Sequence, residues 1–406
     1  MTDQRSGKSV LIILPEFPYP FRANGLSLRY FPIIEHLSKR CVIDLIITGK
    51  YSADPEIIKV LDNYCRKTTY ISYPTASKGI KIAKFIIWST FLFPWAMPRS
   101  WIQYERKNIM KAFKSATDQD TYDVVICVTG YNYPLVMGIT GRKLIVDFVD
   151  SPSLLAKRNV IGSSRTAVVR KYEWLKMVNW EAKIIRKADS TIYISPIDAG
   201  YVPSILTPGK QRTVIPNGYS AAEYTASIEP SVRTPNIGFL GNMSYFPNIE
   251  SVQWLYNNIF KPLREKRKNL TLYIIGRSPD ESIVQLTDDQ NVHVTGLVEN
   301  IWPYINAIDV FVFPILRGGG LKNKILETMF AKRPVVTTSI GNEGLNAVSG
   351  RDLIICREPD EFRQTIERLL ESPSERQQLG TSGHRYVVDR FAWEKFLKTY
   401  EMIVSE

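Results

Sequence analysis

The sequence predicts an α/β protein with two doubly wound, parallel-sheet domains, and three observations support this prediction. The chain has 406 residues, a length that corresponds to two or three domains of ordinary size. Short β-rich runs alternate with amphipathic helical segments, which is the pattern of parallel strands connected by helices. This alternation stops at Pro216-Asn217-Gly218 and then begins again, so the second series of elements indicates a second domain.

The first series of elements is expected between residues 9 and 194. Short apolar runs predict buried strands, and apolar residues at helical spacing predict helices, as in the segment RKYEWLKMVNWEAKIIRK. The expected strands are residues 9–14, 42–48, 123–128, 144–148 and 190–194, and the expected helices are residues 26–37 and 170–187.

The second series follows a linker rich in serine, threonine and proline that extends to Pro235. The expected strands are residues 237–240, 271–275, 292–294, 310–313 and 335–337, and the expected helices are residues 249–258 and 321–330. The segment Ser372-Pro373-Ser374-Glu375 predicts a further helix, because it has a capping box with proline at the first helical position.

The composition excludes several classes of protein. Hydrophobic residues make up 44% and charged residues 23%, as in ordinary soluble proteins, so wholesale disorder, collagen and a disulfide scaffold are excluded. The four cysteines are scattered without a CxxC pair, which favours a reduced, cytosolic chain without a zinc finger. The three histidines lie far apart in the sequence, so no metal site is expected.

We expect neither a signal peptide nor a membrane-spanning helix from the sequence. The apolar stretch near the N-terminus is short and runs into Pro15-Glu16-Phe17-Pro18 without a typical cleavage site. The most apolar uncharged run, FIIWSTFLFPWAMP at residues 85–98, has 14 residues and two prolines. It is therefore shorter than the ~20 residues that a spanning helix needs.

The positive charge is concentrated in the first half of the chain. Residues 1–215 carry 31 lysines and arginines against 17 acidic residues, a net charge of +14, whereas residues 216–406 carry 21 against 23, a net charge of −2. The first half is therefore expected to meet an anionic partner, with nucleic acid and anionic lipid as the two candidates.

Residues 78–114 favour the lipid. This segment has eight basic residues and one acidic residue, and they flank the apolar, tryptophan-containing run. Such an arrangement is typical of interfacial membrane contacts, whereas nucleic-acid-binding segments interleave aromatic and basic residues. We expect contact with an anionic membrane surface through residues 78–114 and no nucleic-acid partner. The alternative is that the segment forms buried helices of the first domain.

The segment most indicative of chemistry is the glycine-rich turn at residues 317–327, RGGGLKNKILE. A strand ends before the three glycines and a helix follows, so free backbone N–H groups at a helix N-terminus can bind an anion. Lys322 and Lys324 add positive charge, and the Glu327 carboxylate can accept hydrogen bonds from hydroxyl groups. These features fit a nucleoside diphosphate, although the spacing is not that of a Walker A loop. A glycine turn with a solvated helix is the alternative interpretation.

The same segment, continued as GGGLKNKILETMFAKRPVVTTSIGNEGL, resembles the donor-site signature of GT4-type glycosyltransferases with the GT-B fold. Other parts of the chain resemble that family in the expected order, and together they span most of the sequence. They are the glycine loop and helix at 15–40, the helix and strand at 172–198, the crossover VIPNG at 214–218, the strands at 237–255 and 272–279, and the C-terminal helix at 391–403.

The resemblance implies a GT-B fold with two Rossmann-like domains facing a cleft. Residues 1–215 would bind the acceptor, with residues 388–406 packing back on them, and residues 216–387 would bind the nucleotide sugar. The family implies a reaction that retains the anomeric configuration and uses neither a bound metal nor a cofactor. The protein would then have to stabilise the leaving diphosphate, on which negative charge develops.

The resemblance also implies roles for particular residues of the nucleotide-binding domain. Glu327 would bind the ribose hydroxyls. Lys324, with the amides of Gly320 and Leu321, would hold the diphosphate, and Lys324 and Glu327 are therefore the candidate catalytic residues on this side. Gly319 and Lys322 would complete the phosphate-binding turn.

Three further positions match the family by their place in the sequence. Gly241, after the first strand of the second series, would leave room for the sugar phosphate. Gly25 would let the loop of the first domain approach the same phosphates. Arg277, after the strand LYIIG, would contact the base or the phosphate.

Among the departures from the family pattern, one concerns the sugar contact and another concerns the group near the reacting carbon. Gly319 stands where many relatives have a first glutamate, eight residues before Glu327. The loops at 127–132 and 147–151 lack the histidine that relatives often have there, so Asp150 is the best-placed ionisable group. It would orient the acceptor hydroxyl or act as a base. A helix cap or a structural hydrogen bond is the alternative role for Asp150.

The sequence as a whole predicts a glycosyltransferase that moves a sugar from a nucleotide-diphosphate sugar, a UDP- or GDP-sugar, to a hydroxyl of a lipid-linked or saccharide acceptor. We expect it in cell-envelope polysaccharide or glycolipid synthesis, as a cytoplasmic protein peripheral to the inner face of the membrane. The alternatives are a nucleotide-sugar epimerase of the same fold and a non-catalytic membrane- or nucleic-acid-binding protein with a degenerate GT-B fold.

Overall fold

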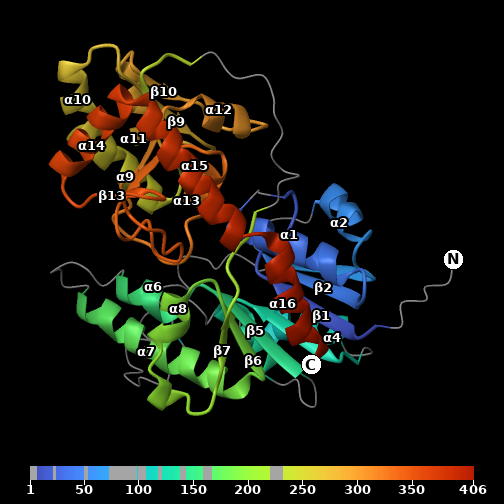
Figure 1. Cartoon of the computed structure of the whole chain (residues 1–406). Helices are drawn as coiled ribbons and strands as arrows, with labels where there is room; N and C mark the ends of the chain where they lie inside the picture. Colours follow the sequence, from blue (N-terminus) through green and yellow to red (C-terminus); the bar gives the residue numbers. More distant parts are fainter. Residues whose placement is uncertain are drawn as a thin grey trace. The chain divides into compact units, whose positions relative to one another are not determined.

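The chain forms two compact units, each built on its own parallel sheet (Figure 1). The computed structural model describes residues 7–21, 24–49, 54–72, 98, 107–117, 121–137, 143–158, 167–219 and 232–406. Unit 1 comprises Met1–Asn217 and Glu394–Glu406, and unit 2 comprises Gly218–Trp393. The chain therefore leaves unit 1 after residue 217 and returns to it at residue 394.

Unit 1 contains a seven-stranded sheet with the order β3-β2-β1-β4-β5-β6-β7 and only parallel pairings. Its strands are β1 (Ser9–Leu14), β2 (Val42–Gly49), β3 (Lys67–Ser72), β4 (Val124–Val128), β5 (Lys143–Val149), β6 (Ser190–Tyr193) and β7 (Arg212–Val214). The five expected strands are confirmed. The two additional strands, β3 and β7, are the edges of the sheet, where partial exposure permits the polar residues that hide a strand pattern.

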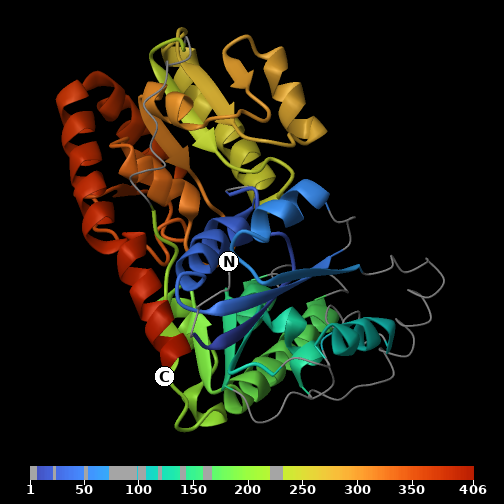
Figure 2. The ribbon, with the colours of Figure 1, turned by 90° about the vertical axis from the view of Figure 1, so that its right-hand side faces the viewer.

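The helices of unit 1 cover both faces of this sheet (Figure 2). They are α1 (Gly25–Leu37), α2 (Pro55–Leu61), α4 (Lys107–Thr117), α5 (Tyr133–Val136), α6 (Pro152–Arg158), α7 (Ala167–Lys187), α8 (Pro196–Tyr201) and α16 (Trp393–Ser405), with the 3-10 turns η2 (Gly130–Asn132) and η3 (Ser204–Leu206). The start of α1 is fixed by a capping box. The Asn24 side chain accepts from the Ser27 N–H at 2.7 Å, and the Ser27 hydroxyl accepts from the Asn24 N–H at 2.9 Å.

The C-terminal helix α16 belongs to unit 1 from residue 394 onward. The Lys143 amine donates to the Ile403 carbonyl at 2.6 Å, which places a cation at the negative end of the helix. Earlier in α16, the Tyr400 hydroxyl lies 3.0 Å from the Tyr30 hydroxyl of α1, and both rings are fully buried. The helix is thus fixed to the core of unit 1.

A fully buried ion pair joins three segments of unit 1. Arg29 of α1 and Asp147 of β5 have no exposed surface, and their Nη2 and Oδ2 atoms lie 2.8 Å apart. Asp147 also accepts from the Tyr30 hydroxyl at 2.8 Å. The other arm of the Arg29 guanidinium donates to the Ile215 carbonyl at 2.8 Å and to the Asn217 side chain at 3.1 Å. The residues through which the chain leaves unit 1 are therefore held by this pair.

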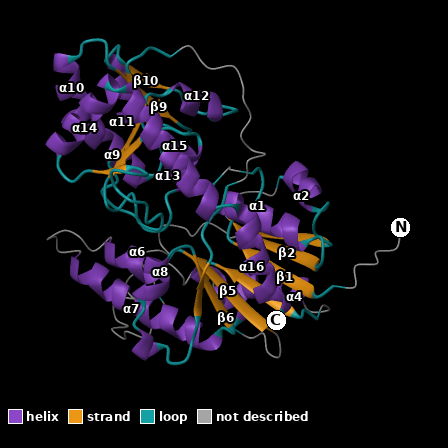
Figure 3. Cartoon of the chain, in the orientation of Figure 1, coloured by secondary structure: helices purple, strands orange, loops and turns teal. Residues whose placement is uncertain are grey.

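Unit 2 contains a six-stranded parallel sheet with the order β10-β9-β8-β11-β12-β13, flanked by helices (Figure 3). Its strands are β8 (Asn236–Leu240), β9 (Thr271–Ile275), β10 (Val292–Val294), β11 (Val310–Phe313), β12 (Val335–Thr337) and β13 (Ile354–Ile355). Its helices are α9 (Phe246–Leu255), α10 (Lys261–Lys266), α11 (Glu281–Val284), α12 (Trp302–Ala307), α13 (Asn323–Phe330), α14 (Pro359–Glu371) and α15 (Pro373–Arg390), with the π turn η5 (Tyr256–Phe260) and the 3-10 turn η6 (Gln285–Asp288).

The strands expected in the second series are confirmed, and two expected helices have different starting points. α9 begins at Phe246, because Pro247 occupies its first turn, where a missing N–H costs nothing. α13 begins at Asn323 instead of residue 321, because Gly318 and Gly320 have φ angles of +118° and +65°. These left-handed conformations keep the glycine turn outside the helix.

The capping box expected at residues 372–375 is only half formed. The Ser372 hydroxyl accepts from the Glu375 N–H at 3.3 Å and caps α15. However, Ser372 is also the C-cap residue that follows α14, so its N–H donates to the Arg368 carbonyl at 3.0 Å. The Glu375 carboxylate instead lies 3.1 Å from the Arg368 guanidinium. The reciprocal bond was a wrong prediction, because two consecutive helices share this residue.

Most of the expected membrane-contact segment, residues 78–114, lies outside the described residues. In its described part, Ile109 and Phe113 of α4 are buried in the core of unit 1. Within the described ranges of the chain, no helix has the length and apolar character that a membrane span requires.

Candidate functional site

The candidate site lies at the carboxyl edge of the unit 2 sheet, where the loops after β8, β9 and β11 come together. The Gly241 N–H donates to the Ile275 carbonyl at 3.0 Å, and the Met243 N–H donates to the Arg277 carbonyl at 2.9 Å. Gly276 has a φ angle of +143°, and a Cβ atom there would lie 1.8 Å from the Gly241 oxygen. Only glycine fits this close approach, so the loops after β8 and β9 lie backbone against backbone.

The glycine turn before α13 is held by two basic side chains. Lys322 donates to the carbonyls of its own turn, to Gly319 at 2.5 Å and to Gly320 at 2.8 Å. Arg317 forms an ion pair of 2.6 Å with Glu250 of α9. Both contacts fix the conformation of the turn before any ligand arrives. The Lys322 side chain therefore has a structural task in addition to the charge that the sequence predicts.

Lys324 is the basic residue at the centre of the candidate site. Its amine donates to the Asn248 side-chain oxygen at 2.5 Å and lies 4.5 Å from the centre of the Phe239 ring. A Cβ atom at Gly241 would lie 3.5 Å from the same amine, so the absence of a side chain at Gly241 keeps space beside it. Burial, followed by repulsion from Lys322, lowers the pKa of Lys324 from 10.5 to about 7.

The structure brings Gly241, Gly319, Gly320, Lys322 and Lys324 together at this edge, as the contacts above show. Leu321 is buried and anchors the turn. Glu327 is partly buried one turn of α13 beyond Lys324, a spacing that puts both side chains on one side of the helix.

The two remaining residues predicted to contact the donor lie in different units. Arg277 follows β9 beside the Gly241 loop, where its carbonyl accepts from Met243 and its side chain is partly exposed. Gly25 lies in unit 1 as the first residue of α1, and a Cβ atom there would meet no heavy atom of the described residues within 4 Å. No contact with the described residues therefore requires glycine at residue 25.

Asp150 lies at the carboxyl edge of the unit 1 sheet, directly after β5. The preceding Val149 has a φ angle of +63°, and Thr129, which follows the neighbouring strand β4, has a φ angle of +62°. β-branched residues rarely adopt this region, and such strain is concentrated at functional sites. Asp150 is partly exposed. The pKa of Tyr131 is raised mainly by burial of the Tyr131 hydroxyl and, secondly, by the negative charge of Asp150.

A buried carboxylate that the sequence analysis missed supports the turn after Asp150. Glu181 of α7 is fully buried and accepts from the Ser151 hydroxyl at 3.0 Å, the Ser153 N–H at 3.0 Å and the Tyr193 hydroxyl at 3.0 Å. Burial raises the pKa of Glu181 to about 7, although these donors act in the opposite direction. The spacing in the sequence could have indicated this burial, because Glu181 lies four residues after Met177 and therefore shares the apolar face of α7.

Replacing Glu181 with glutamine should change how stability depends on pH. The folded-state pKa of about 7 lies above the ordinary 4.5, so between these values the folded state binds more protons than the unfolded state. The free energy of unfolding of the wild type should therefore fall as the pH rises from 4.5 to 7, by up to about 3 kcal/mol from this group. Glu181→Gln, which does not titrate, should lack this component.

Urea unfolding of wild type and Glu181→Gln at pH 4.5, 6 and 7.5 measures this difference. Glu394→Gln, at an exposed glutamate of α16, is the matched control and should follow the wild type at every pH. Parallel profiles of wild type and Glu181→Gln would show that Glu181 does not titrate in this range.

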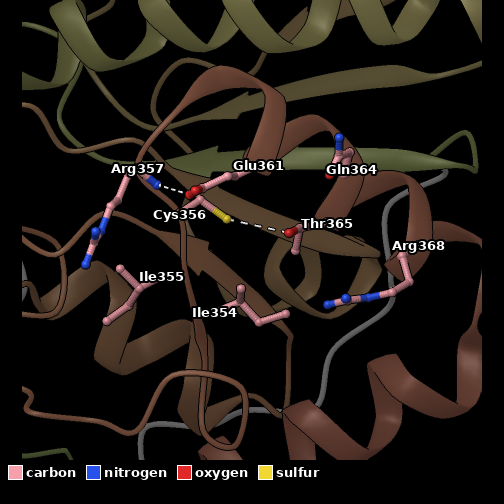
Figure 4. Close-up of a pocket in the computed structure, with 8 residues that line it drawn as sticks. All are labelled: Ile354, Ile355, Cys356, Arg357, Glu361, Gln364, Thr365 and Arg368. Carbon is pink, nitrogen blue, oxygen red and sulfur yellow. Dashed lines mark hydrogen bonds between the residues drawn. The ribbon is translucent and has the colours of Figure 1, made fainter.

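A separate open pocket of about 550 Å³ lies between β13 and α14 (Figure 4). Its lining residues are Ile354, Ile355, Cys356, Arg357, Glu361, Gln364, Thr365 and Arg368. The Glu361 carboxylate already accepts from the Arg357 N–H at 2.7 Å, and the Cys356 thiol lies 3.6 Å from the Thr365 hydroxyl. None of the residues that the sequence predicts as functional lines this pocket, so it is not part of the candidate site.

The sequence of the chain is similar to known proteins. Residues 234–372 match the family described as glycosyl transferases group 1. An uncharacterized glycosyltransferase of Methanocaldococcus jannaschii, MJ1069, is 23% identical over 234 residues, which cover 54% of this chain and 59% of that protein. An uncharacterized 44.6 kDa protein in the cps region of Klebsiella pneumoniae is 20% identical over 402 residues, which cover 95% of this chain and 97% of that protein. This chain thus spans little more than half the length of the first relative.

The whole chain is also similar in fold to solved structures. Sucrose-phosphate synthase from Thermosynechococcus elongatus superposes with a TM-score of 0.71 at 16% identity, and the match covers 98% of each chain. Anabaena Alr3699/HepE, solved in complex with UDP and glucose, superposes with a TM-score of 0.64 at 14% identity and covers 98% of this chain and 99% of that one. Together with the two parallel sheets, these similarities give the chain the GT-B fold.

Proposed function

We propose that this protein is a glycosyltransferase of the GT4 type that transfers a sugar from a nucleotide-diphosphate sugar to an acceptor hydroxyl, with retention of configuration and without a metal. The observation that carries the proposal is the environment of Lys324. Among the residues that the structure describes, this amine makes no ion pair, yet it lies beside the gap at Gly241 and behind a preorganised glycine turn. A cation held in this way lacks an anion, which a diphosphate would supply.

The proposed donor site uses each group for a separate task. Lys324 and the backbone N–H groups of Gly320 and Leu321 would stabilise the negative charge that develops on the leaving diphosphate. The Glu327 carboxylate would accept hydrogen bonds from the ribose hydroxyls. Arg277 would contact the base or the phosphate. Because the positive charge comes from the chain itself, departure of the diphosphate does not depend on a bound metal ion.

Unit 1 would bind the acceptor in this proposal. Asp150 lies at the carboxyl edge of its sheet, which is where doubly wound folds bind ligands. It would orient the acceptor hydroxyl or accept its proton, and Gly25 would approach the phosphates of the donor. A lipid-linked or saccharide acceptor of cell-envelope synthesis, reached from the cytoplasmic face of the membrane through residues 78–114, agrees with the charge and aromatic content of that segment.

The donor is proposed to be a UDP- or GDP-sugar. Binding of a ligand to the native state raises the unfolding temperature, so thermal unfolding in the presence of UDP, GDP, ADP, CMP and dTDP identifies the base. The matching nucleotide sugars, incubated with lipid acceptors, then test turnover. Transfer releases the nucleoside diphosphate, whereas an epimerase would leave the sugar attached to it. The absence of stabilisation by any nucleotide at millimolar concentration would contradict the proposed function.

The Glu327→Ala variant tests the assignment of the ribose contact. Because hydrogen bonds to a charged group contribute about 1.5–3 kcal/mol, the affinity for the stabilising nucleotide should fall about 10- to 100-fold. Titration calorimetry measures the loss. Glu265→Ala, at an exposed glutamate of α10 in the same unit, is the control and should bind as the wild type does. Equal affinities of Glu327→Ala and wild type would remove Glu327 from the site.

A further inference from the structure

Asn248 is a nearly fully buried residue in the first turn of α9 that the sequence analysis did not select. Its side-chain nitrogen donates to the Asn242 carbonyl at 2.8 Å, and its side-chain oxygen accepts from the Lys324 amine at 2.5 Å. The first contact needs a donor and the second needs an acceptor, so the two contacts together fix the orientation of the amide.

Asn242 belongs to the loop after β8, and Lys324 belongs to α13, which follows β11. The Asn248 amide therefore connects two loops of the candidate site through a single rigid group. The aromatic rings of Phe239 and Phe313, 4.5 and 5.8 Å from the Lys324 amine, limit its freedom from the strand side. Within the described residues, the bond to Asn248 is the hydrogen bond that directs this amine.

The charge of the partner matters as much as its position. Asn248 is neutral, so it holds the Lys324 amine without neutralising it. Lys322 is the charged group that acts on the amine, and its effect is repulsive; the nearby Arg317 is already paired with Glu250. An aspartate of almost the same shape at residue 248 would supply the missing anion and would compete with a phosphate for the amine.

We propose that Asn248 is a positioning residue that sets the Lys324 amine for the diphosphate of the donor while leaving its positive charge available. The inference rests on the proposed donor site and extends it to a residue that need not touch the substrate. It predicts that the neutrality of residue 248, and not only its size, determines the affinity for a nucleoside diphosphate.

The experiment compares wild type, Asn248→Asp and Asn248→Ala by titration calorimetry with UDP and GDP between pH 7 and 9. In the wild type, affinity should fall as the pH rises, because the amine loses its proton over this range. Asn248→Asp should bind at least about 10-fold more weakly at pH 7 and should lose this pH dependence, because an ion pair keeps Lys324 charged. Asn248→Ala should bind about 5-fold more weakly and retain the pH dependence.

Two controls separate positioning from a general effect. Asn257→Asp makes the same charge change at an exposed asparagine on the adjoining turn and should bind as the wild type does. In a Lys324→Met background, Asn248→Ala should have no additional effect, because coupled residues are not additive. Circular dichroism and thermal unfolding without ligand check that each variant is folded.

The possible failures are distinguishable. If wild type binds UDP or GDP and both Asn248 variants bind equally well with the same pH profile, the role of Asn248 is overturned and the proposed function stands. If Asn248→Ala weakens binding equally in the presence and absence of Lys324, Asn248 acts independently of the amine and the inference is again wrong. If wild type binds no nucleoside diphosphate, the proposed function and this inference fail together.

Discussion

The Lys324→Met variant is expected to bind the nucleoside diphosphate about 100-fold more weakly than the wild type. Methionine has a similar length and no charge, so the variant removes the cation while it keeps much of the contact with Phe239. A charge-assisted bond to a phosphate contributes up to about 3 kcal/mol, which corresponds to this loss of affinity. Titration calorimetry at pH 7 measures it directly.

The same variant should also change two properties that depend on pH. Lys324 has a folded-state pKa of about 7, below the ordinary 10.5, so between these values the unfolded state binds more protons. The free energy of unfolding of the wild type therefore receives a component that rises as the pH increases from 7 to 10.5, and Lys324→Met should lack it. Binding of a diphosphate favours the charged amine, so UDP binding to the wild type at pH 8 should take up protons.

Calorimetry in two buffers with different ionisation enthalpies measures this proton uptake. Lys268→Met, at an exposed lysine of unit 2, is the matched control and should retain both affinity and proton uptake. Unchanged affinity of Lys324→Met, or equal proton uptake in wild type and variant, would show that Lys324 does not contact the phosphates.

The Asp147→Asn variant should lower the free energy of unfolding by about 3–5 kcal/mol. The substitution keeps the shape of the side chain but leaves the fully buried Arg29 guanidinium without its counter-charge. Breaking one side of a buried pair has a cost of this size, because the remaining charge stays desolvated. The Tyr30 hydroxyl, which donates to Asp147 at 2.8 Å, also loses a charged acceptor.

Urea unfolding followed by far-UV circular dichroism measures this loss of stability. Asp360→Asn, which removes one side of an exposed ion pair with Arg363 in unit 2, is the control and should cost at most about 1 kcal/mol. The double variant Arg29→Met with Asp147→Asn should recover part of the loss, because no unpaired charge remains. A loss below about 1 kcal/mol in Asp147→Asn would mean that water or a rearranged side chain compensates Arg29.

Much of the fold is predictable from the sequence because its signals are local. The central strands β1, β4, β8, β9 and β11 are short apolar runs between turn residues, and a buried parallel strand needs no other pattern. The glycine turn before α13 is visible for the same reason, since three consecutive glycines after a strand permit few other structures. The edge strands β3 and β7 escape prediction, because partial exposure removes the apolar run that identifies the others.

The candidate site is only partly local. Lys324, Gly320 and Glu327 lie within one turn and helix, so their proximity follows from their spacing. Asn248, by contrast, lies 76 residues before Lys324, and its side chain meets the amine only because β8 and β11 are neighbours in the sheet. No property of the segment around Asn248 distinguishes it from any other asparagine near the start of a helix.

The sequence by itself therefore determined the fold class, the glycine turn and the basic residues that follow it. The tertiary structure decided that Lys324 makes no ion pair within the described part of the chain. It also decided which carboxylate, Glu181, is buried and which arginine, Arg29, is paired across 118 residues of sequence with Asp147. The physical reason is that periodicity and turn chemistry act between near neighbours in the chain. Burial, charge pairing and the resulting pKa shifts depend on which strands and helices the topology places side by side.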